Sequence, residues 1–276
     1  MGPAALRLQS SGAEAPGLVV EFAQRTRSGL YRDNNEDAIG CWSHAEEFLF
    51  AVADGVGGYD RGEVASFTAI DTLAKTLADA PAGWRADRRL RHAVEQANLA
   101  VHDPTAAPMA TTLTATLFGR STLVTAHVGD CRLFRLRGGV LQQLTSDHNV
   151  AARLVSLGLL SAEDRPRHPG RRMVTRCLGQ EPFIRVDLFT ATLRPGDVYL
   201  QCSDGVANLA GAHISEILRG HDPETAATLL MERGLESAGG DDTSVQVALV
   251  VSCIEAPERR ESFGWSRIAA LLGWSL

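Results

Sequence analysis

Four short acidic patches, far apart in the sequence, place the strongest constraint on how this chain folds. They are residues 32–37, 53–58, 203–205 and 239–242. Two of these patches end runs of apolar residues that are typical of buried strands, residues 48–53 and 197–202. Their aspartates are therefore expected at the edge of an apolar core, where the core meets solvent.

Carboxylates gathered at such an edge repel one another unless something neutralises them. At an effective dielectric constant of about 20, two charges about 4 Å apart interact by roughly 4 kcal/mol. A bound cation or a proton removes this repulsion. Because oxygen ligands suit Mg²⁺ or Mn²⁺, the pattern indicates a divalent-metal site.

Composition limits the class of protein. With 276 residues, 45% of them hydrophobic, the chain has enough apolar material for one large core, and two small cores are the less favoured alternative. A net charge of -6 and a pI near 5.8 argue against a nucleic-acid-binding surface, which would carry a basic stripe. The expected partner is instead a small anion presented by another protein.

The cysteines and both ends of the chain predict its compartment and its domain limits. The 5 cysteines have no CxxC spacing and lie mostly beside apolar residues, so we expect reduced thiols and a cytosolic protein. Residues 1–17 are expected to form a disordered leader rather than a signal peptide. One catalytic domain is expected over residues 18–253. Residues 254–276 are expected to form a linker and a short apolar helix, too short to span a bilayer.

Blocks of strand-like and helix-like segments favour an α+β fold rather than a regular βαβ repeat. Two glycines, Gly138 and Gly139, separate two strand-like runs and predict a tight hairpin, so at least part of the sheet is antiparallel. Apolar periodicity predicts helices over residues 63–78, 87–101, 213–219 and 223–234. Strands are expected over residues 18–23, 48–53, 112–118, 123–128, 133–137, 140–144, 184–190, 198–202 and 244–251.

The order of the motifs resembles that of the PPM or PP2C family of metal-dependent protein serine/threonine phosphatases, in its compact bacterial branch. A single Asp-Gly turn is common, whereas seven motifs in the family's order are specific. The resemblance covers residues 18–251. The motifs are Arg32-Asp33-Asn34-Asn35-Glu36-Asp37, Ala53-Asp54-Gly55-Val56-Gly57-Gly58, Met109-Ala110-Thr111-Thr112, Gly129-Asp130-Cys131-Arg132, Thr145-Ser146-Asp147-His148, Ser203-Asp204-Gly205 and Gly240-Asp241-Asp242-Thr243.

The resemblance implies a four-layer α-β-β-α sandwich, in which helices flank two mostly antiparallel sheets and a two-metal site lies at one end. By position, Asp54 corresponds to the carboxylate that bridges both metals, and Gly55 corresponds to a backbone carbonyl ligand. Arg32 corresponds to the arginine that binds phosphate, a role for which a planar guanidinium is suited.

The remaining metal ligands follow from the same resemblance. Asp204 and Asp241 would complete the first metal, and Glu36 and Asp37 would hold the second metal directly or through waters. Asp241 is preferred to Asp242 because relatives usually carry Asn at the second position. Asp130 would help to bind a third, weaker ion.

The implied reaction is hydrolysis of phosphoserine and phosphothreonine by in-line attack of a water that bridges two Mn²⁺ or Mg²⁺ ions, without a phosphoenzyme. The leaving alkoxide needs a proton. Some family members carry a histidine after the bridging aspartate, whereas Val56 and Tyr59 stand there in this chain. His148 and a metal-bound water are both candidates for the general acid.

An arginine-rich stretch between His148 and Glu181 resembles the family's flap beside the active site. Arg171 and Arg172 in this stretch are candidate substrate contacts, and a solvated surface loop is the default interpretation.

The implied biological role is signalling, with phosphorylated proteins and a cognate bacterial serine/threonine kinase as partners. Two other functions stay open. A pseudophosphatase would bind Mn²⁺ and phosphoproteins without turnover. A metal-dependent phosphodiesterase or a phosphatase of a small metabolite would have a pocket closed over the metals, whereas an open groove favours a protein substrate.

Overall fold

The computed structural model describes residues 11–15, 17–44, 47–57, 61–103, 105, 107–207, 209–237 and 240–254. Residues 1–10 of the expected leader, Tyr59 and the expected C-terminal helix lie outside the described residues.

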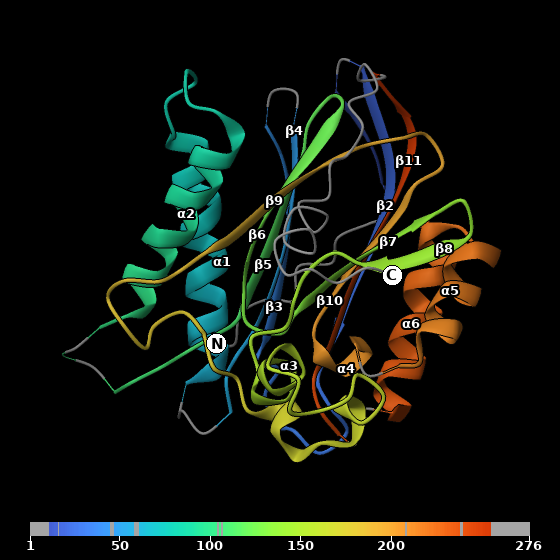
Figure 1. The fold of residues 1–276 in the computed structure, drawn as a ribbon. Helices are drawn as coiled ribbons and strands as arrows, with labels where there is room; N and C mark the ends of the chain where they lie inside the picture. The colour runs from blue at the N-terminus through green and yellow to red at the C-terminus, as the bar shows by residue number, and fades with distance from the viewer. Residues whose placement is uncertain are drawn as a thin grey trace, which may run out of the picture.

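Two antiparallel sheets form the centre of the molecule (Figure 1). The first sheet, in spatial order, contains β1 (Ser11–Ala15), β2 (Leu18–Arg27), β11 (Thr243–Cys253), β10 (Val198–Cys202), β7 (Arg132–Arg137) and β8 (Val140–Gln143). The second sheet contains β3 (Asp37–His44), β4 (Glu47–Asp54), β5 (Leu113–Phe118), β6 (Thr122–Val128) and β9 (Asp187–Thr192).

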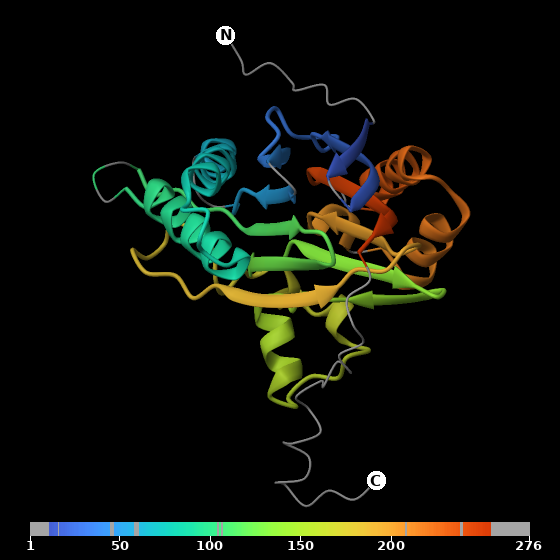
Figure 2. The ribbon, with the colours of Figure 1, turned by 90° about the horizontal axis from the view of Figure 1, so that it is seen from above.

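Helices cover the outer face of each sheet (Figures 1 and 2). Helices α1 (Gly62–Asp79) and α2 (Ala86–Val101) pack on the second sheet, and α5 (Gly211–Gly220) and α6 (Pro223–Ser237) flank the first. The expected α+β sandwich of four layers, α-β-β-α, is confirmed. Within the part of the chain that the structure describes, none of the helices has both the length and the apolar character needed to cross a bilayer.

Short helical segments gather at one end of the sandwich, the lower end in Figure 1. They are α3 (Val150–Ser156), η1 (Arg165–Arg167), η2 (Pro169–Arg172) and α4 (Asp204–Ala207). The first three belong to the segment between His148 and Glu181, which we call the flap.

Strand β4 shows why the sequence before Asp54 is continuously apolar. Successive side chains of a strand point to opposite faces. Leu49 and Ala51 pack in the cluster beneath α1 and α2, whereas Phe48 and Phe50 pack in the cluster between the two sheets. A strand that is buried on both faces needs apolar residues at every position, and Asp54 lies where that burial ends.

The predicted hairpin at Gly138 and Gly139 is confirmed. Strands β7 and β8 pair in antiparallel fashion on either side of the two glycines. Their φ angles are 55° and 80°, the left-handed region that a two-residue turn of this kind requires.

Two strands lie where none was expected. Strand β1 falls inside the expected disordered leader, and that expectation is wrong for Ser11–Ala15 because these residues pair with β2 and form the edge of the first sheet, with Ala15 opposite Leu18. Strand β3 was missed because Gly40 and Ser43 interrupt the branched residues that mark strands. Backbone pairing with β4 decides its conformation.

Candidate metal centre

Asp37 and Asp54 lie opposite each other on neighbouring strands. Asp37 begins β3, Asp54 ends β4, and the strand register pairs the two residues. Burial raises the pKa of Asp54 well above its ordinary value, and the charges of Asp37, Asp204, Asp130 and Asp241 add to the rise. Five carboxylates from separate parts of the sequence therefore act on one another at this end of the sandwich.

Asp204 and Asp130 reach this centre from the ends of two other strands. Asp204 follows β10 and begins α4, and Asp130 lies in the turn between β6 and β7. Burial raises the pKa of Asp130 to about 8, with Asp204 and Asp147 contributing. Burial also raises the pKa of Asp204 to about 6, and Asp241 adds to that effect. Each carboxylate is thus disfavoured as an anion while no cation is present.

Asp37 provides the test of whether these residues fit a cation. Its Oδ2 accepts a hydrogen bond of 2.7 Å from the hydroxyl of Ser203. Its Oδ1 is buried and has no hydrogen-bond partner among the described residues. Burial raises the pKa of Asp37 to about 7. A buried, unpartnered carboxylate oxygen among other carboxylates suits a hard divalent cation, so the residues fit Mg²⁺ or Mn²⁺.

Arg32 engages two of the expected metal ligands. Its guanidinium forms ion pairs with Glu36 and Asp241, and Nη1 lies 3.6 Å from Oδ2 of Asp242. In this arrangement, with Glu36 and Asp241 paired to Arg32, no three His, Cys, Asp or Glu side chains within the described residues are grouped closely enough to hold one metal ion. A cation bound between the aspartates would have to compete with Arg32 for Glu36 and Asp241.

Asp242 makes different contacts from its neighbour Asp241. Its side chain is only 3% exposed, and its two oxygens accept hydrogen bonds from the backbone N–H groups of Gly29, at 2.9 Å, and Glu36, at 2.8 Å. Asp241 is 29% exposed and faces Arg32. These contacts support Asp241 as the ligand and make Asp242 a support for the backbone that carries Glu36.

Two glycines allow the backbone to approach closely around the aspartates. A Cβ atom on Gly55 would lie 2.6 Å from the backbone carbonyl carbon of Gly62, at the start of α1. Gly129 adopts a φ of 112°, and a Cβ there would lie 2.4 Å from Cβ of Thr112. Larger residues would push the segments that carry Asp54 and Asp130 out of place.

Both ring nitrogens of His148, a candidate general acid, have hydrogen-bond partners. Its Nδ1 accepts a hydrogen bond of 2.9 Å from the backbone N–H of Gly129, which leaves the proton of the neutral ring on Nε2. Nε2 lies 3.0 Å from Oδ2 of Asp187 and donates to it. Burial lowers the pKa of His148. With both nitrogens engaged, these contacts favour a structural role for His148, and His148 and a metal-bound water stay the two predicted candidates for the general acid.

The flap brings the two candidate substrate contacts close to the carboxylates. Arg171 and Arg172 lie on η2, and their charges, with that of Arg132, oppose the rise in the pKa of Asp204. Backbone hydrogen bonds close the base of the flap, from the N–H of Thr175 to the carbonyl of His148 at 2.7 Å. The flap arginines are therefore near enough to Asp204 to act on its charge.

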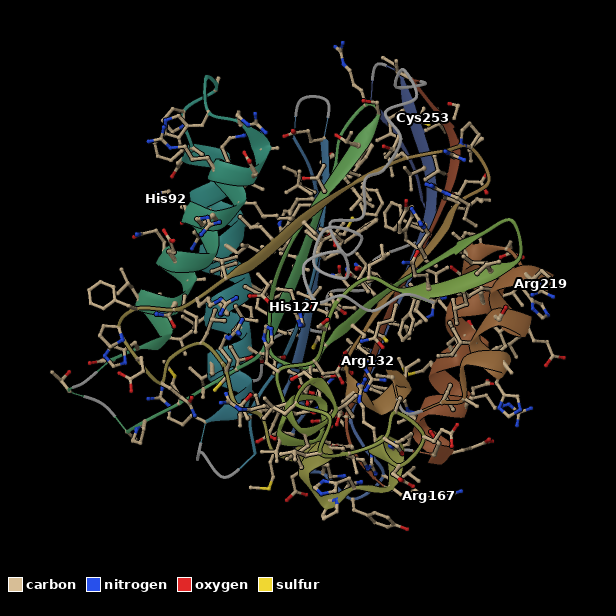
Figure 3. All side chains as sticks on the ribbon, viewed as in Figure 1. His92, His127, Arg132, Arg167, Arg219 and Cys253 are labelled. Carbon is tan, nitrogen blue, oxygen red and sulfur yellow. The ribbon has the colours of Figure 1, made fainter. Side chains whose placement is uncertain are left out.

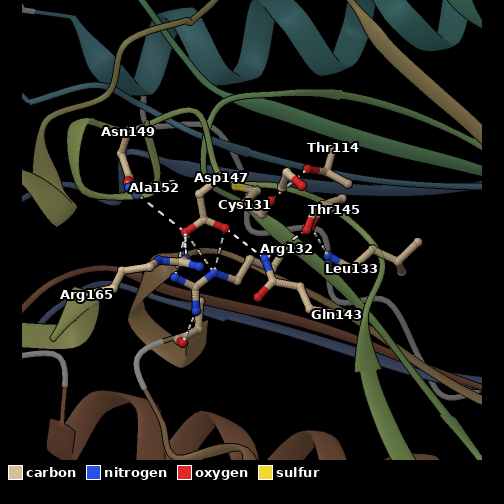
Figure 4. Close-up of polar contacts among 12 residues, drawn as sticks. Thr114, Cys131, Arg132, Leu133, Gln143, Thr145, Asp147, Asn149, Ala152 and Arg165 are labelled. Carbon is tan, nitrogen blue, oxygen red and sulfur yellow. Dashed lines mark hydrogen bonds and ion pairs between the residues drawn. The ribbon is translucent and has the colours of Figure 1, made fainter. Parts of the chain in front are cut away.

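The structure adds residues that the sequence analysis did not identify. Ser203 orients Asp37, and its place directly before Asp204 is the one sequence signal for it. A cluster of charged residues joins the buried Asp147 to the partly buried Arg132 and Arg165 (Figure 4; Figure 3 labels Arg132), and the charge of Asp147 acts on Asp130. Nothing in the sequence pairs Arg165 with Asp147.

Comparison with known proteins gives consistent matches. The family described as protein phosphatase 2C matches residues 27–233. The serine/threonine protein phosphatase PstP of Mycobacterium tuberculosis is 38% identical over 241 residues, which cover 85% of this chain and 46% of PstP. This chain thus spans about half the length of that relative. The serine/threonine phosphatase stp of Listeria monocytogenes is 33% identical over 236 residues, which cover 82% of this chain and 93% of stp.

A solved structure is similar over nearly the same region. It is the crystal structure of the catalytic domain of serine threonine protein phosphatase PstP in complex with 2 manganese ions. The TM-score is 0.74 at 36% sequence identity, and the match covers 85% of this chain and 100% of the other.

Proposed function

The chain belongs to the protein phosphatase 2C family, and on that premise we propose that it is a metal-dependent protein serine/threonine phosphatase. The observation that carries the proposal is the convergence of four buried or half-buried carboxylates with raised pKa values, one of which has an unpartnered oxygen. They are Asp37, Asp54, Asp130 and Asp204. Two divalent ions, Mn²⁺ or Mg²⁺, would neutralise them, and a relative's catalytic domain holds two manganese ions.

The proposed ligands are those that correspond to the family's motifs. Asp54 would bridge both ions, and the Gly55 carbonyl would add a ligand. The other side chains in the set are Glu36, Asp37, Asp204 and Asp241, with Asp130 for a third, weaker ion. When bound, the cations would lower the pKa of a water and neutralise charge on the phosphoryl oxygens.

Arg32 is the proposed phosphate-binding residue. Glu36 and Asp241 occupy its guanidinium in the present arrangement. Cations that draw these carboxylates away would leave N–H groups of Arg32 able to donate two parallel hydrogen bonds to phosphate oxygens. We assign no side chain to protonation of the leaving alkoxide, because His148 has both nitrogens engaged.

Phosphorylated proteins are the proposed substrates, in the cytosol and in opposition to a bacterial serine/threonine kinase. The names of the relatives as serine/threonine protein phosphatases support this substrate class. The basic flap beside Asp204 adds a surface that suits an anionic peptide.

A substrate panel tests the proposed function. Phosphate release would be measured with Mn²⁺ from a phosphothreonine peptide, para-nitrophenyl phosphate, sugar phosphates and a phosphodiester. We expect the peptide to have the highest kcat/KM. Preference for a sugar phosphate or for the diester would replace the proposal with a metabolite-directed enzyme. Stoichiometric Mn²⁺ binding with no turnover of any substrate would indicate a pseudophosphatase.

The flap arginines should affect binding of a protein substrate more than the chemical step. In the double variant Arg171→Ala and Arg172→Ala, we expect KM for a phosphoprotein to rise about three- to tenfold, because two positive charges that would attract an acidic peptide around the phosphorylated residue are lost. Turnover of para-nitrophenyl phosphate should change by less than about twofold.

The matched control for this variant removes two other flap charges, in Arg153→Ala and Arg167→Ala. Unlike Arg171 and Arg172, neither of these arginines is among the main groups that shift the pKa of Asp204. Equal KM values for the phosphoprotein in wild type and in both double variants would show that the flap arginines do not contact the substrate.

A further inference from the structure

A group of charges centred on the buried Asp147 joins the flap to the framework of the molecule (Figure 4). The side chain of Asp147 has no exposed surface. Its Oδ2 accepts hydrogen bonds from Nη2 of Arg132, at 2.6 Å, and from Nη2 of Arg165, at 2.5 Å. Its Oδ1 accepts a third, at 2.9 Å, from Nε of Arg132. We call these three residues the clamp.

Arg132 connects the clamp to two candidate metal ligands. It begins β7, two positions after Asp130. Its Nη1 donates to the backbone carbonyl of Ala207, in the short helix α4 that begins with Asp204. A displacement of Arg132 would therefore shift the segments that carry Asp130 and Asp204.

Arg165 is the clamp residue that belongs to the body of the flap. It begins η1, and its side chain is 26% exposed, against 16% for Arg132. The other side chains that bond to Asp147, Gln143 and Asn149, come from β8 and from the residue before α3. The contact of Arg165 therefore crosses from the middle of the flap to the framework.

The charges of the clamp indicate what loss of Arg165 would do. Burial favours the neutral form of Asp147, but the guanidinium groups of Arg132 and Arg165 outweigh it and hold the pKa of Asp147 below its ordinary value. Without Arg165, the carboxylate would still be paired with Arg132 in two-point contact. The core would keep one cation for one anion, so the variant should fold, whereas the flap would lose its tie.

We propose that Arg165 is a positioning residue, which holds the flap against α4 and the turn after β6 through Asp147 and Arg132. Arg171 and Arg172 follow closely on η2 and act on Asp204, so the clamp sets where these arginines stand relative to the carboxylates. The consequence for catalysis rests on the proposed phosphatase function. The mechanical part of the proposal, that Arg165 holds the flap in place, does not.

Amide hydrogen exchange of peptides within residues 157–173 tests the mechanical part. We expect exchange in Arg165→Met to be about five- to tenfold faster than in wild type. In wild type, the flap can open only when the partly buried ion pair between Arg165 and Asp147 breaks, and the variant lacks this pair. Arg165→Lys keeps the charge but loses the planar fork and should fall between the two.

The matched control is Arg167→Met. Arg167 lies on the same η1 segment and is exposed, at the outer edge of the molecule in Figure 3. In this variant, the amides of residues 157–173 should exchange at the wild-type rate. If exchange in Arg165→Met were no faster than in Arg167→Met, the clamp would not hold the flap and the proposal would be overturned.

Kinetics then test the link to catalysis. Arg165→Met should raise KM for a phosphothreonine peptide by about threefold or more, with kcat changed less, because a loosened flap presents its arginines less often. If wild type hydrolysed nothing, the proposed function would fail while exchange still decided the clamp. If exchange rose but KM did not, the flap would be held by the clamp without serving substrate binding.

Discussion

Replacing Asp54 with Asn is expected to lower kcat for a phosphothreonine peptide by at least about a thousandfold, because the residue would bridge both cations. The same substitution removes a carboxylate whose pKa is raised by desolvation and by the neighbouring carboxylates. The metal-free variant should therefore be at least as stable as wild type. Loss of activity together with undiminished stability in EDTA is a combination that damage to the fold would not produce.

The control for this experiment is Asp33→Asn. Asp33 is exposed and lies beside Arg32, so the change in charge is the same and occurs near the same site. We expect its kcat to stay within about threefold of wild type, as for most exposed substitutions. A kcat for Asp54→Asn above about a tenth of wild type would contradict the assignment of Asp54.

The stability of the metal-free protein is expected to fall as pH rises from 6.5 to 8. The pKa of Asp37 is about 7 and that of Asp130 is about 8, both above the ordinary value of 3.8. In this range the folded chain binds protons that the unfolded chain has already lost, so raising the pH favours unfolding. The free energy of unfolding should fall by about 2 kcal/mol across the window.

The pH range from 6.5 to 8 separates the contribution of the aspartates to the change in stability from that of His127. Burial lowers the pKa of His127 to about 4, from an ordinary value of 6.5, so this residue makes stability rise with pH below 6.5 and not above it. Urea unfolding in EDTA at pH 6.5 and pH 8 measures the slope. Asp130→Asn should flatten it, and saturating Mn²⁺ should do the same because cations replace the protons. A rise in stability with pH in EDTA would show that these carboxylates are not buried together.

Sequence patterns predicted the elements whose residues carry their own signal. The apolar run before Asp54 and the pair Gly138 and Gly139 predicted a buried strand and a hairpin, and both are confirmed. The four-layer arrangement came from the resemblance of the motifs to a family and is likewise confirmed. Strand β3 was missed because its pairing with β4, rather than its own residues, determines it.

The site shows the same division between local and long-range information. Asp54 and Asp204 were identified from motifs at strand ends. The support given by Asp242 depends on contacts with Gly29 and Glu36, more than two hundred positions earlier in the chain. The pairing of Arg165 with Asp147 is another such contact. Local periodicity carries no trace of these contacts, because they arise only when the strand ends meet.

The most direct test of the account is phosphate release from a phosphothreonine peptide by the wild-type protein, with Mn²⁺, with Mg²⁺ and with EDTA. We predict turnover with at least one of the two metals, none in EDTA, and recovery when the metal is restored. Isothermal titration should give two tight Mn²⁺ ions per chain in the same preparation. Turnover that is undiminished in EDTA, or a folded and Mn²⁺-loaded protein that releases no phosphate, would contradict it.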